Sequence, residues 1–145
     1  MKKSILILFT IIIIVVTIIF VNYSSYKNEY NVILKENAEI EKYAENEIHG
    51  IELGTLINKV IDKNTKNKVE KDDNDVFISN EQNSIQIEIY MKDNETTYKM
   101  ETFYNAGIAQ FIQYYGNVKF KCSKIQYHKN TGKIKYLLFE QMVTS

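Results

Sequence analysis

The feature that most constrains this chain is an apolar run near its start, from Ile5 to Val21, interrupted only by Thr10 and Thr17. A helix that spans the hydrocarbon core of a bilayer needs roughly 17–25 mostly apolar residues, so this run is just long enough. Backbone N–H and C=O groups find no water inside a bilayer, and a helix satisfies all of them internally. The sequence therefore predicts a transmembrane helix over residues 5–21.

The residues that flank the run predict its orientation. Lys2 and Lys3 precede it, and Tyr23 and Tyr26 follow it. Lysines are enriched on the cytoplasmic side of membrane helices, and tyrosines are enriched at the membrane–water interface. We therefore expect residues 1–4 in the cytoplasm and the rest of the chain outside it, in a single-pass protein of the cell membrane.

A cleaved signal peptide is the alternative interpretation of the run. Signal peptides have an apolar stretch of about 7–15 residues followed by a cleavage site with small residues. The run here is longer, and the segment that follows it, Val21-Asn22-Tyr23-Ser24-Ser25, has no convincing pair of small residues at that spacing. The sequence thus favours an uncleaved anchor.

Residues 22–49 keep a helical spacing of apolar residues although they are mostly polar, which predicts a stalk helix outside the membrane. The narrow stripe of apolar residues on this helix has two interpretations. It packs on the globular head that follows in the chain, or it contacts a partner helix or a second copy. In a coiled coil, an Asn in the stripe would fix the register of the two helices. The candidate stripe consists of Ile33, Asn37, Ile40 and Ala44.

Residues 50–145 are expected to form an extracytoplasmic α+β domain with a small antiparallel sheet and two covering helices. The apolar periodicity predicts helices over 51–63 and 104–115, the first ended by Asn64 in a left-handed conformation. Residues 64–75, which have no apolar period, are predicted to form a polar loop. A strand is predicted over 85–91, followed by a turn at 92–96 and a returning strand that contains Tyr98 and Met100. A hairpin is predicted over 118–138. A β-bulge near Ser123 and a turn at 130–132 complete the hairpin.

Composition excludes several classes of protein. The chain has 18 basic residues, all of them Lys, against 18 acidic residues, with one Cys and two His. A disulfide framework and a cysteine-rich zinc module are excluded, and a neutral chain without Arg is a poor nucleic-acid binder. The abundance of Ile, Asn, Lys and Tyr is typical of AT-rich bacterial genomes.

The C-terminal hairpin is rich in lysine. Alternation along the strands directs most of these side chains to the solvent face. They form either a solvated outer face or a patch that binds an anionic polymer or lipid of the cell envelope. The candidate patch consists of Lys119, Lys121, Lys133 and Lys135.

Side chains that could carry chemistry are few. His49 has Glu45 and Glu52 near it in sequence, but one His with scattered carboxylates is more typical of a structural or exposed residue than of a metal site. His128 is expected at the surface, and Cys122 is expected to point inward as a small core residue. The run Asp72-Asp73-Asn74-Asp75 lacks the Gly and the distant Glu of a calcium loop. We therefore predict no catalytic, cofactor or metal site, and we expect that the protein is not an enzyme.

Two resemblances bear on function. The layout of an apolar helix, an amphipathic continuation and a sheet resembles type IV pilins and pseudopilins, although the prepilin cleavage motif and its glutamate are absent around Lys3-Ser4-Ile5. The segments 50–62 and 120–141 are similar to small uncharacterised single-pass membrane proteins of low-GC Gram-positive bacteria, a group that implies no established activity.

The expected function is therefore that of a membrane-anchored, extracytoplasmic protein that acts by protein contact or self-association, as a pilin-like component of a secretion or envelope assembly. The alternative is a membrane-tethered module that binds an anionic envelope polymer or lipid through the lysine-rich hairpin.

Overall fold

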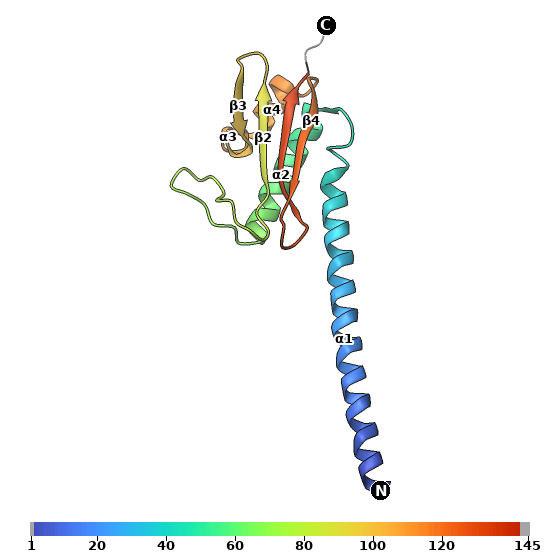
Figure 1. Ribbon diagram of the computed structural model, residues 1–145. Coiled ribbons are helices and arrows are strands. Elements are labelled where there is room, and N and C mark those ends of the chain that lie inside the picture. The colour runs from blue at the N-terminus through green and yellow to red at the C-terminus, as the bar shows by residue number, and fades with distance from the viewer. Residues whose placement is uncertain (1, 143–145) are drawn as a thin grey trace. The chain divides into compact units, whose positions relative to one another are not determined.

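In a computed structural model, which describes residues 2–142, a long helix precedes a head built on a five-stranded sheet (Figure 1). The chain divides into two compact units, residues 1–35 and 36–145, and the boundary between them falls inside the first helix. In chain order the elements are α1 (Lys2–Glu41), β1 (Ile48–His49), α2 (Gly50–Lys66), β2 (Gln86–Met91), β3 (Thr96–Lys99), α3 (Met100–Ala106), α4 (Ile108–Tyr115), β4 (Lys119–Tyr127) and β5 (Ile134–Gln141).

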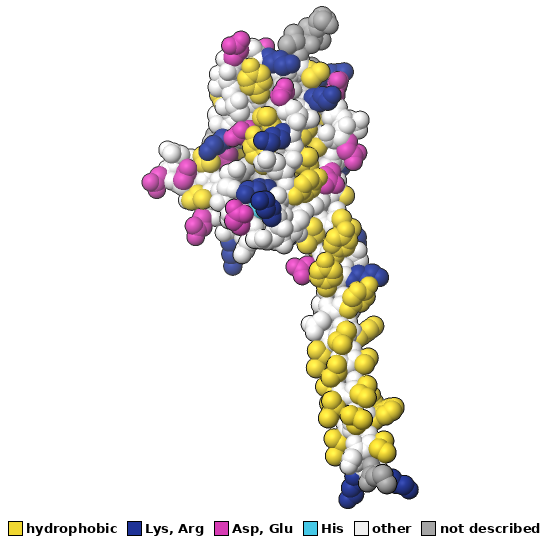
Figure 2. Space-filling view, viewed as in Figure 1, with side chains coloured by type: hydrophobic (Ala, Val, Ile, Leu, Met, Phe, Trp, Pro, Cys, Tyr) yellow, Lys and Arg dark blue, Asp and Glu magenta, His cyan; other side chains and the backbone are white. Residues whose placement is uncertain are grey.

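Helix α1 contains the apolar run. Its most apolar 18-residue window has a mean hydropathy of 3.3, and none of that window is buried. The hydroxyl groups of Thr10 and Thr17 donate hydrogen bonds to the carbonyls of Leu6 and Ile13, so these polar groups are satisfied within the helix. Hydrophobic side chains cover the visible surface of this part of α1 (Figure 2). The helix is thus long and apolar enough to cross a membrane, a property that signal sequences share.

The predicted stalk helix is too long at its C-terminal end. Helix α1 ends at Glu41, where the Tyr43 and Ala44 N–H groups donate to the carbonyls of Ile40 and Glu41 in a tightened last turn. Residues 48 and 49, predicted as helix, form the short edge strand β1 and pair with β4. This pairing buries Ile48, a long-range contact that helical periodicity does not encode.

The α+β class is confirmed, and the sheet is mixed rather than purely antiparallel. Its strand order is β1-β4-β5-β2-β3, and β2 runs parallel to β5 while the other neighbours are antiparallel. Parallel neighbours need a long connection, here supplied by everything between β2 and β5. The predicted bulge is confirmed as a break in pairing between Cys122 and Lys124.

The helices of the head differ from the prediction in two places. Helix α2 continues past Asn64 to Lys66, because the Asn64 side chain is buried and bonds both the N–H and the carbonyl of Ile85. The predicted helix over 104–115 is instead two short helices, α3 and α4, separated by Gly107 at φ 102°. Met100, predicted in a strand, begins α3. Three helices therefore follow α1 in the described chain, where two were expected.

The core lies between the sheet and helices α2, α3 and α4, which cover one of its faces (Figure 1). A Cβ atom at Gly50 would lie 2.0 Å from the Tyr115 carbonyl oxygen. Only glycine therefore allows the start of α2 to approach the end of α4 this closely. The apolar face of α2 meets the inward side chains of β2, β4 and β5, and the largest of these buried residues are Leu53, Leu56, Ile57, Ile87, Ile89, Phe120, Leu137 and Phe139.

Candidate functional site

Beyond the apolar run, α1 keeps an apolar face. Tyr23, Tyr26, Tyr30 and Ile33 follow one another at alternating spacings of three and four, which places them on one side of the helix. We call these four residues the α1 seam. Tyr30 is 52% exposed and the adjacent Leu34 is 48% exposed. Of these four, Ile33 was predicted in the partner stripe and Tyr23 and Tyr26 at the membrane interface, whereas Tyr30 was assigned to neither, although the spacing of three and four residues is visible in the sequence.

The same face continues into the head. Asn37 and Ile40 follow Ile33 at spacings of four and three, and Ile40 is only 1% exposed. Ala44, after the end of the helix, packs against the core of the head. Of the predicted partner stripe, Asn37, Ile40 and Ala44 are therefore occupied by the chain's own head, and only Ile33 belongs to the N-terminal unit.

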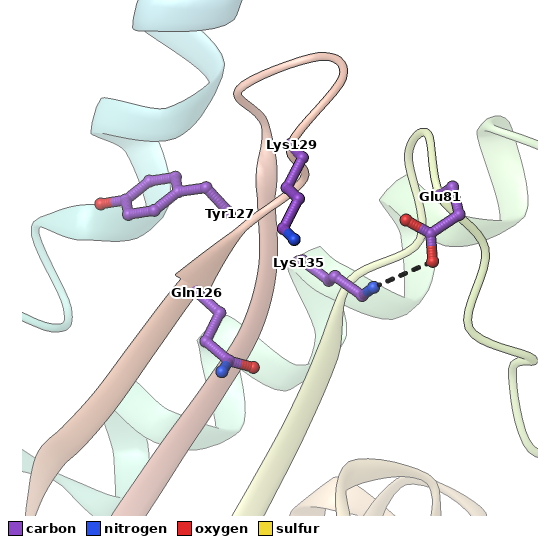
Figure 3. A pocket seen from close by; sticks show the side chains of 5 residues that line it. All are labelled: Glu81, Gln126, Tyr127, Lys129 and Lys135. Atoms are coloured by element: carbon purple, nitrogen blue, oxygen red, sulfur yellow. Dashed lines mark hydrogen bonds and ion pairs between the residues drawn. The ribbon is translucent and has the colours of Figure 1, made fainter.

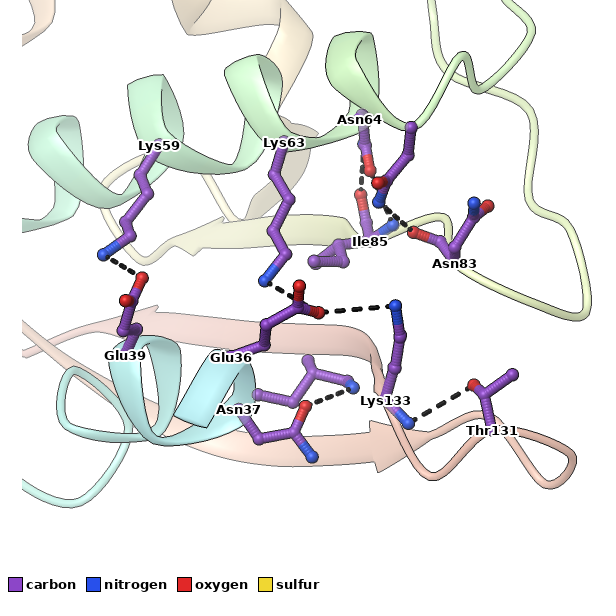
Figure 4. A network of polar contacts seen from close by, with 12 residues as sticks. Glu36, Asn37, Glu39, Lys59, Lys63, Asn64, Asn83, Ile85, Thr131 and Lys133 are labelled. Carbon is purple, nitrogen blue, oxygen red and sulfur yellow. Dashed lines mark hydrogen bonds and ion pairs between the residues drawn. The ribbon is translucent and has the colours of Figure 1, made fainter. Parts of the chain in front are cut away.

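A polar network surrounds the end of α1 (Figure 4). The Asn37 amide nitrogen donates to the Gly132 carbonyl at 2.8 Å, and its oxygen accepts from the Ile134 N–H at 3.1 Å. Across the same end of the sheet, Asn64 bonds Ile85 in both directions. Two buried amides thus fix backbone groups at the starts of β5 and β2, where unpaired groups would be costly.

Ion pairs complete this network. The Glu36 carboxylate lies 3.4 Å from both the Lys63 and the Lys133 ammonium groups. Glu39 lies 2.8 Å from Lys59, and a hydrogen bond from that ammonium holds the pKa of the Glu39 carboxyl below its usual value. Glu36 and Glu39, near the end of α1, are therefore matched by lysines of the same chain.

The four lysines of the predicted patch do not form one surface. Antiparallel pairing of β4 with β5 puts Lys119 and Lys121 at one end of the hairpin and Lys133 and Lys135 at the other. Lys119 pairs with Glu47 at 3.3 Å, Lys133 with Glu36 and Lys135 with Glu81 at 3.4 Å each, and Lys121 lies opposite Glu140 in the sheet.

The two histidines occupy different settings. His49 is exposed, and its backbone N–H donates to the Glu52 carboxylate at 2.9 Å, so Glu52 caps the start of α2. His128 was predicted at the surface, which is wrong: it is 2% exposed, and its Nε2 lies 2.8 Å from the Ser84 carbonyl oxygen. The loop before β2 covers it, a contact between distant segments that the local sequence does not reveal.

Cys122 points inward, as predicted, and is half-buried against Phe139 on the neighbouring strand. Burial raises the pKa of its thiol, so the group is a neutral thiol near pH 7 rather than a nucleophilic thiolate.

The acidic run over residues 72–75 forms a turn that its own side chains stabilise. The Asp72 carboxylate accepts hydrogen bonds from the backbone N–H groups of Asn74 and Val76, and Lys71 pairs with Asp75 at 2.7 Å.

Among residues 2–142, no three His, Cys, Asp or Glu side chains lie together in a way that could hold a metal ion. Comparison with protein-family models, curated proteins and solved structures found no match. In the α1 seam, the three tyrosines are exposed and Ile33 is half-buried. Exposed apolar side chains of this size gain free energy when another surface covers them.

Proposed function

We propose that this protein is anchored in the cell membrane by α1, with its head outside the cytoplasm, and that it works by binding another protein or a second copy within a pilus-like or secretion-type envelope assembly. The observation that carries the proposal is the α1 seam, an apolar helix face that continues past the apolar run and on which three tyrosines are exposed and Ile33 is half-buried.

Membrane anchoring is supported by the composition of α1. The apolar window contains no charged residue. Lys2 and Lys3 lie directly before it, whereas the first lysine after it, Lys27, comes after Tyr23 and Tyr26, and this asymmetry favours a helix that starts in the cytoplasm. Helix α1 does not break after the window but continues to Glu41, whose neighbours Asn37 and Ile40 are part of the head. Because the helix that contains the apolar window continues without a break to residues of the head, an uncleaved anchor is favoured over a cleaved signal peptide.

Protein contact is supported by the nature of the seam. Burying one large apolar side chain stabilises a complex by about 1.5–3 kcal/mol, so a few seam residues are sufficient for a specific helix–helix contact. The tyrosines add hydroxyl groups that can hydrogen-bond at the edge of such a contact. The opposite face of α1 over the same stretch is mostly polar, with Asn28, Asn31 and Lys35, although it includes the exposed Val32, so the seam is the more apolar of the two faces.

The test compares two double variants of the full chain in its native membranes. Tyr30→Ser with Ile33→Ser removes apolar surface from the seam, and Asn31→Ser with Lys35→Ser changes the opposite face of the same helical turns. After gentle extraction in uncharged detergent, we expect wild type and the opposite-face variant to run as a complex and the seam variant as a monomer. Carbonate washing should leave all three chains in the membrane pellet.

Three results would contradict the proposal. If wild type itself runs as a monomer after extraction, or if the two double variants dissociate equally, the seam is not a contact surface. If carbonate releases the wild-type chain from the membrane, α1 is not an anchor.

A further inference from the structure

A pocket of about 510 Å³ lies beside the turn of the β4–β5 hairpin, and none of the residues that line it belongs to the α1 seam. It is lined by Glu81, Gln126, Tyr127, Lys129 and Lys135. Figure 3 shows the Lys129 and Lys135 side chains extending toward the same space, with Glu81 facing Lys135 from the segment before β2. The Tyr127 ring points to the other side, where its hydroxyl donates to the Glu41 carboxylate at 2.9 Å.

The charges in this pocket do not balance. Glu81 lies 3.4 Å from the Lys135 ammonium, a loose ion pair in which the Glu81 side chain is 74% exposed. Lys129 forms no ion pair with any residue between 2 and 142. One carboxylate therefore faces two ammonium groups, and the excess positive charge is held in a concave site beside the Gln126 amide.

We propose that this pocket binds the phosphodiester group of a soluble or wall-linked polyol phosphate chain. Two lysines approach the ligand from different sides, and lysine binds phosphate as a point charge without the planar fork that arginine offers to a carboxylate. The Gln126 amide can hydrogen-bond a hydroxyl group next to the phosphate.

A polymer ligand fits this lining better than a lipid headgroup does. None of the five lining residues is aliphatic, and the one aromatic ring points away from the lysines, so the pocket offers no apolar group to insert between acyl chains. This binding site is separate from the protein contact proposed for α1. Of the four lysines in the patch predicted from the sequence, only Lys135 lines the pocket.

The test titrates full-length protein in uncharged detergent with a soluble poly(glycerol phosphate) oligomer at fixed low salt, with calorimetry as the readout. Replacing both pocket lysines, Lys129→Gln with Lys135→Gln, should weaken binding by at least about 10-fold because both charge-assisted contacts are lost. Glu81→Gln should strengthen binding, because it removes the one carboxylate that competes for Lys135.

The matched control is Lys121→Gln with Lys124→Gln, which removes the same charge from the same hairpin. Lys121 lies opposite Glu140 and Lys124 lies over the Tyr136 ring at 5.7 Å, both outside the pocket. This variant should change the affinity by less than about 3-fold, because exposed lysines at a distance contribute only screened attraction. Circular dichroism of each variant verifies that the head stays folded.

Four outcomes would overturn the proposal. Equal weakening by the two lysine pairs would mean attraction to the overall charge, and equal binding of a polyglutamate chain of the same length would remove the phosphate assignment. Binding only to phosphatidylglycerol vesicles would identify a lipid surface instead. Failure of the wild-type protein to bind the oligomer would leave no polymer site.

Discussion

The side-chain oxygen of Asn37 accepts a hydrogen bond from the backbone N–H of Ile134 at 3.1 Å and so joins the end of α1 to the first residue of β5. The same amide donates to the Gly132 carbonyl in the hairpin turn. Because the amide donates to one backbone group and accepts from another, both hydrogen bonds form only when the helix and the hairpin are in one relative position. Asn37, expected to set the register of a coiled coil, thus sets the register of α1 against its own hairpin.

Asn37→Ala should therefore destabilise the head. It leaves the buried N–H of Ile134 without its acceptor, which costs about 1–3 kcal/mol. Asn58→Ala, on the exposed face of α2, is the control and should change stability by less than about 0.5 kcal/mol. Urea unfolding of the full chain in uncharged detergent measures both values. Equal stability of the two variants would show that the Asn37 amide does not hold the end of α1.

Ile40→Ala should separate stability from partner binding. Ile40 is fully packed in the core, so its truncation should cost about 2–5 kcal/mol of the free energy of unfolding. Leu34→Ala, less than two turns earlier and half exposed, should cost less than about 1 kcal/mol. If Leu34→Ala destabilised the head as much as Ile40→Ala, the exposed surface of α1 next to the seam would be part of the fold rather than a surface that is free for a partner.

The Cys122 thiol should react slowly with an alkylating reagent. Burial raises its pKa, so at pH 8 less thiolate is present than on an exposed cysteine, and alkylation by iodoacetamide should be slower than on an exposed cysteine. A raised pKa favours the neutral thiol in the folded state, so its contribution to stability is present below the ordinary thiol pKa and is lost as the pH rises through the higher folded value.

The control for this prediction places a thiol at the next residue, which is exposed, as Ser123→Cys in a Cys122→Ala chain. That thiol should react at the rate of a free cysteine, and its pH–rate profile should have its midpoint at a lower pH than that of Cys122. Coincident profiles would mean that Cys122 is not shielded.

Periodic patterns predicted most of the fold correctly. The apolar run, the strand at 85–91 and the hairpin with its bulge are local patterns, because a period of two or of three to four residues is encoded by neighbours in the chain. The features predicted wrongly depend on distant partners. The strand at Ile48 needs β4, the extension of α2 past Asn64 needs Ile85, and the parallel neighbour of β2 is the last strand.

The candidate sites were predicted less well for the same reason. Alternation correctly directs most of the hairpin lysines outward, but it cannot show that Lys133 pairs with Glu36 or that Lys129 and Lys135 line one pocket. Three residues of the predicted stripe, Ile33, Asn37 and Ile40, lie on one face of α1, but Ala44 lies after the end of the helix. Tertiary packing, which the periodicity does not encode, buries Asn37 and Ile40.

The most direct test of the central claim is a cysteine scan of α1 from residue 26 to 35 in native membranes, made in a Cys122→Ala chain so that each variant has one thiol. Short-range thiol crosslinking should be efficient at the seam positions Tyr26, Tyr30 and Ile33 and weak at Asn28, Asn31 and Lys35 on the opposite face, giving a period of three to four residues. Uniform crosslinking around the helix, or none at any position, would contradict a seam-mediated contact.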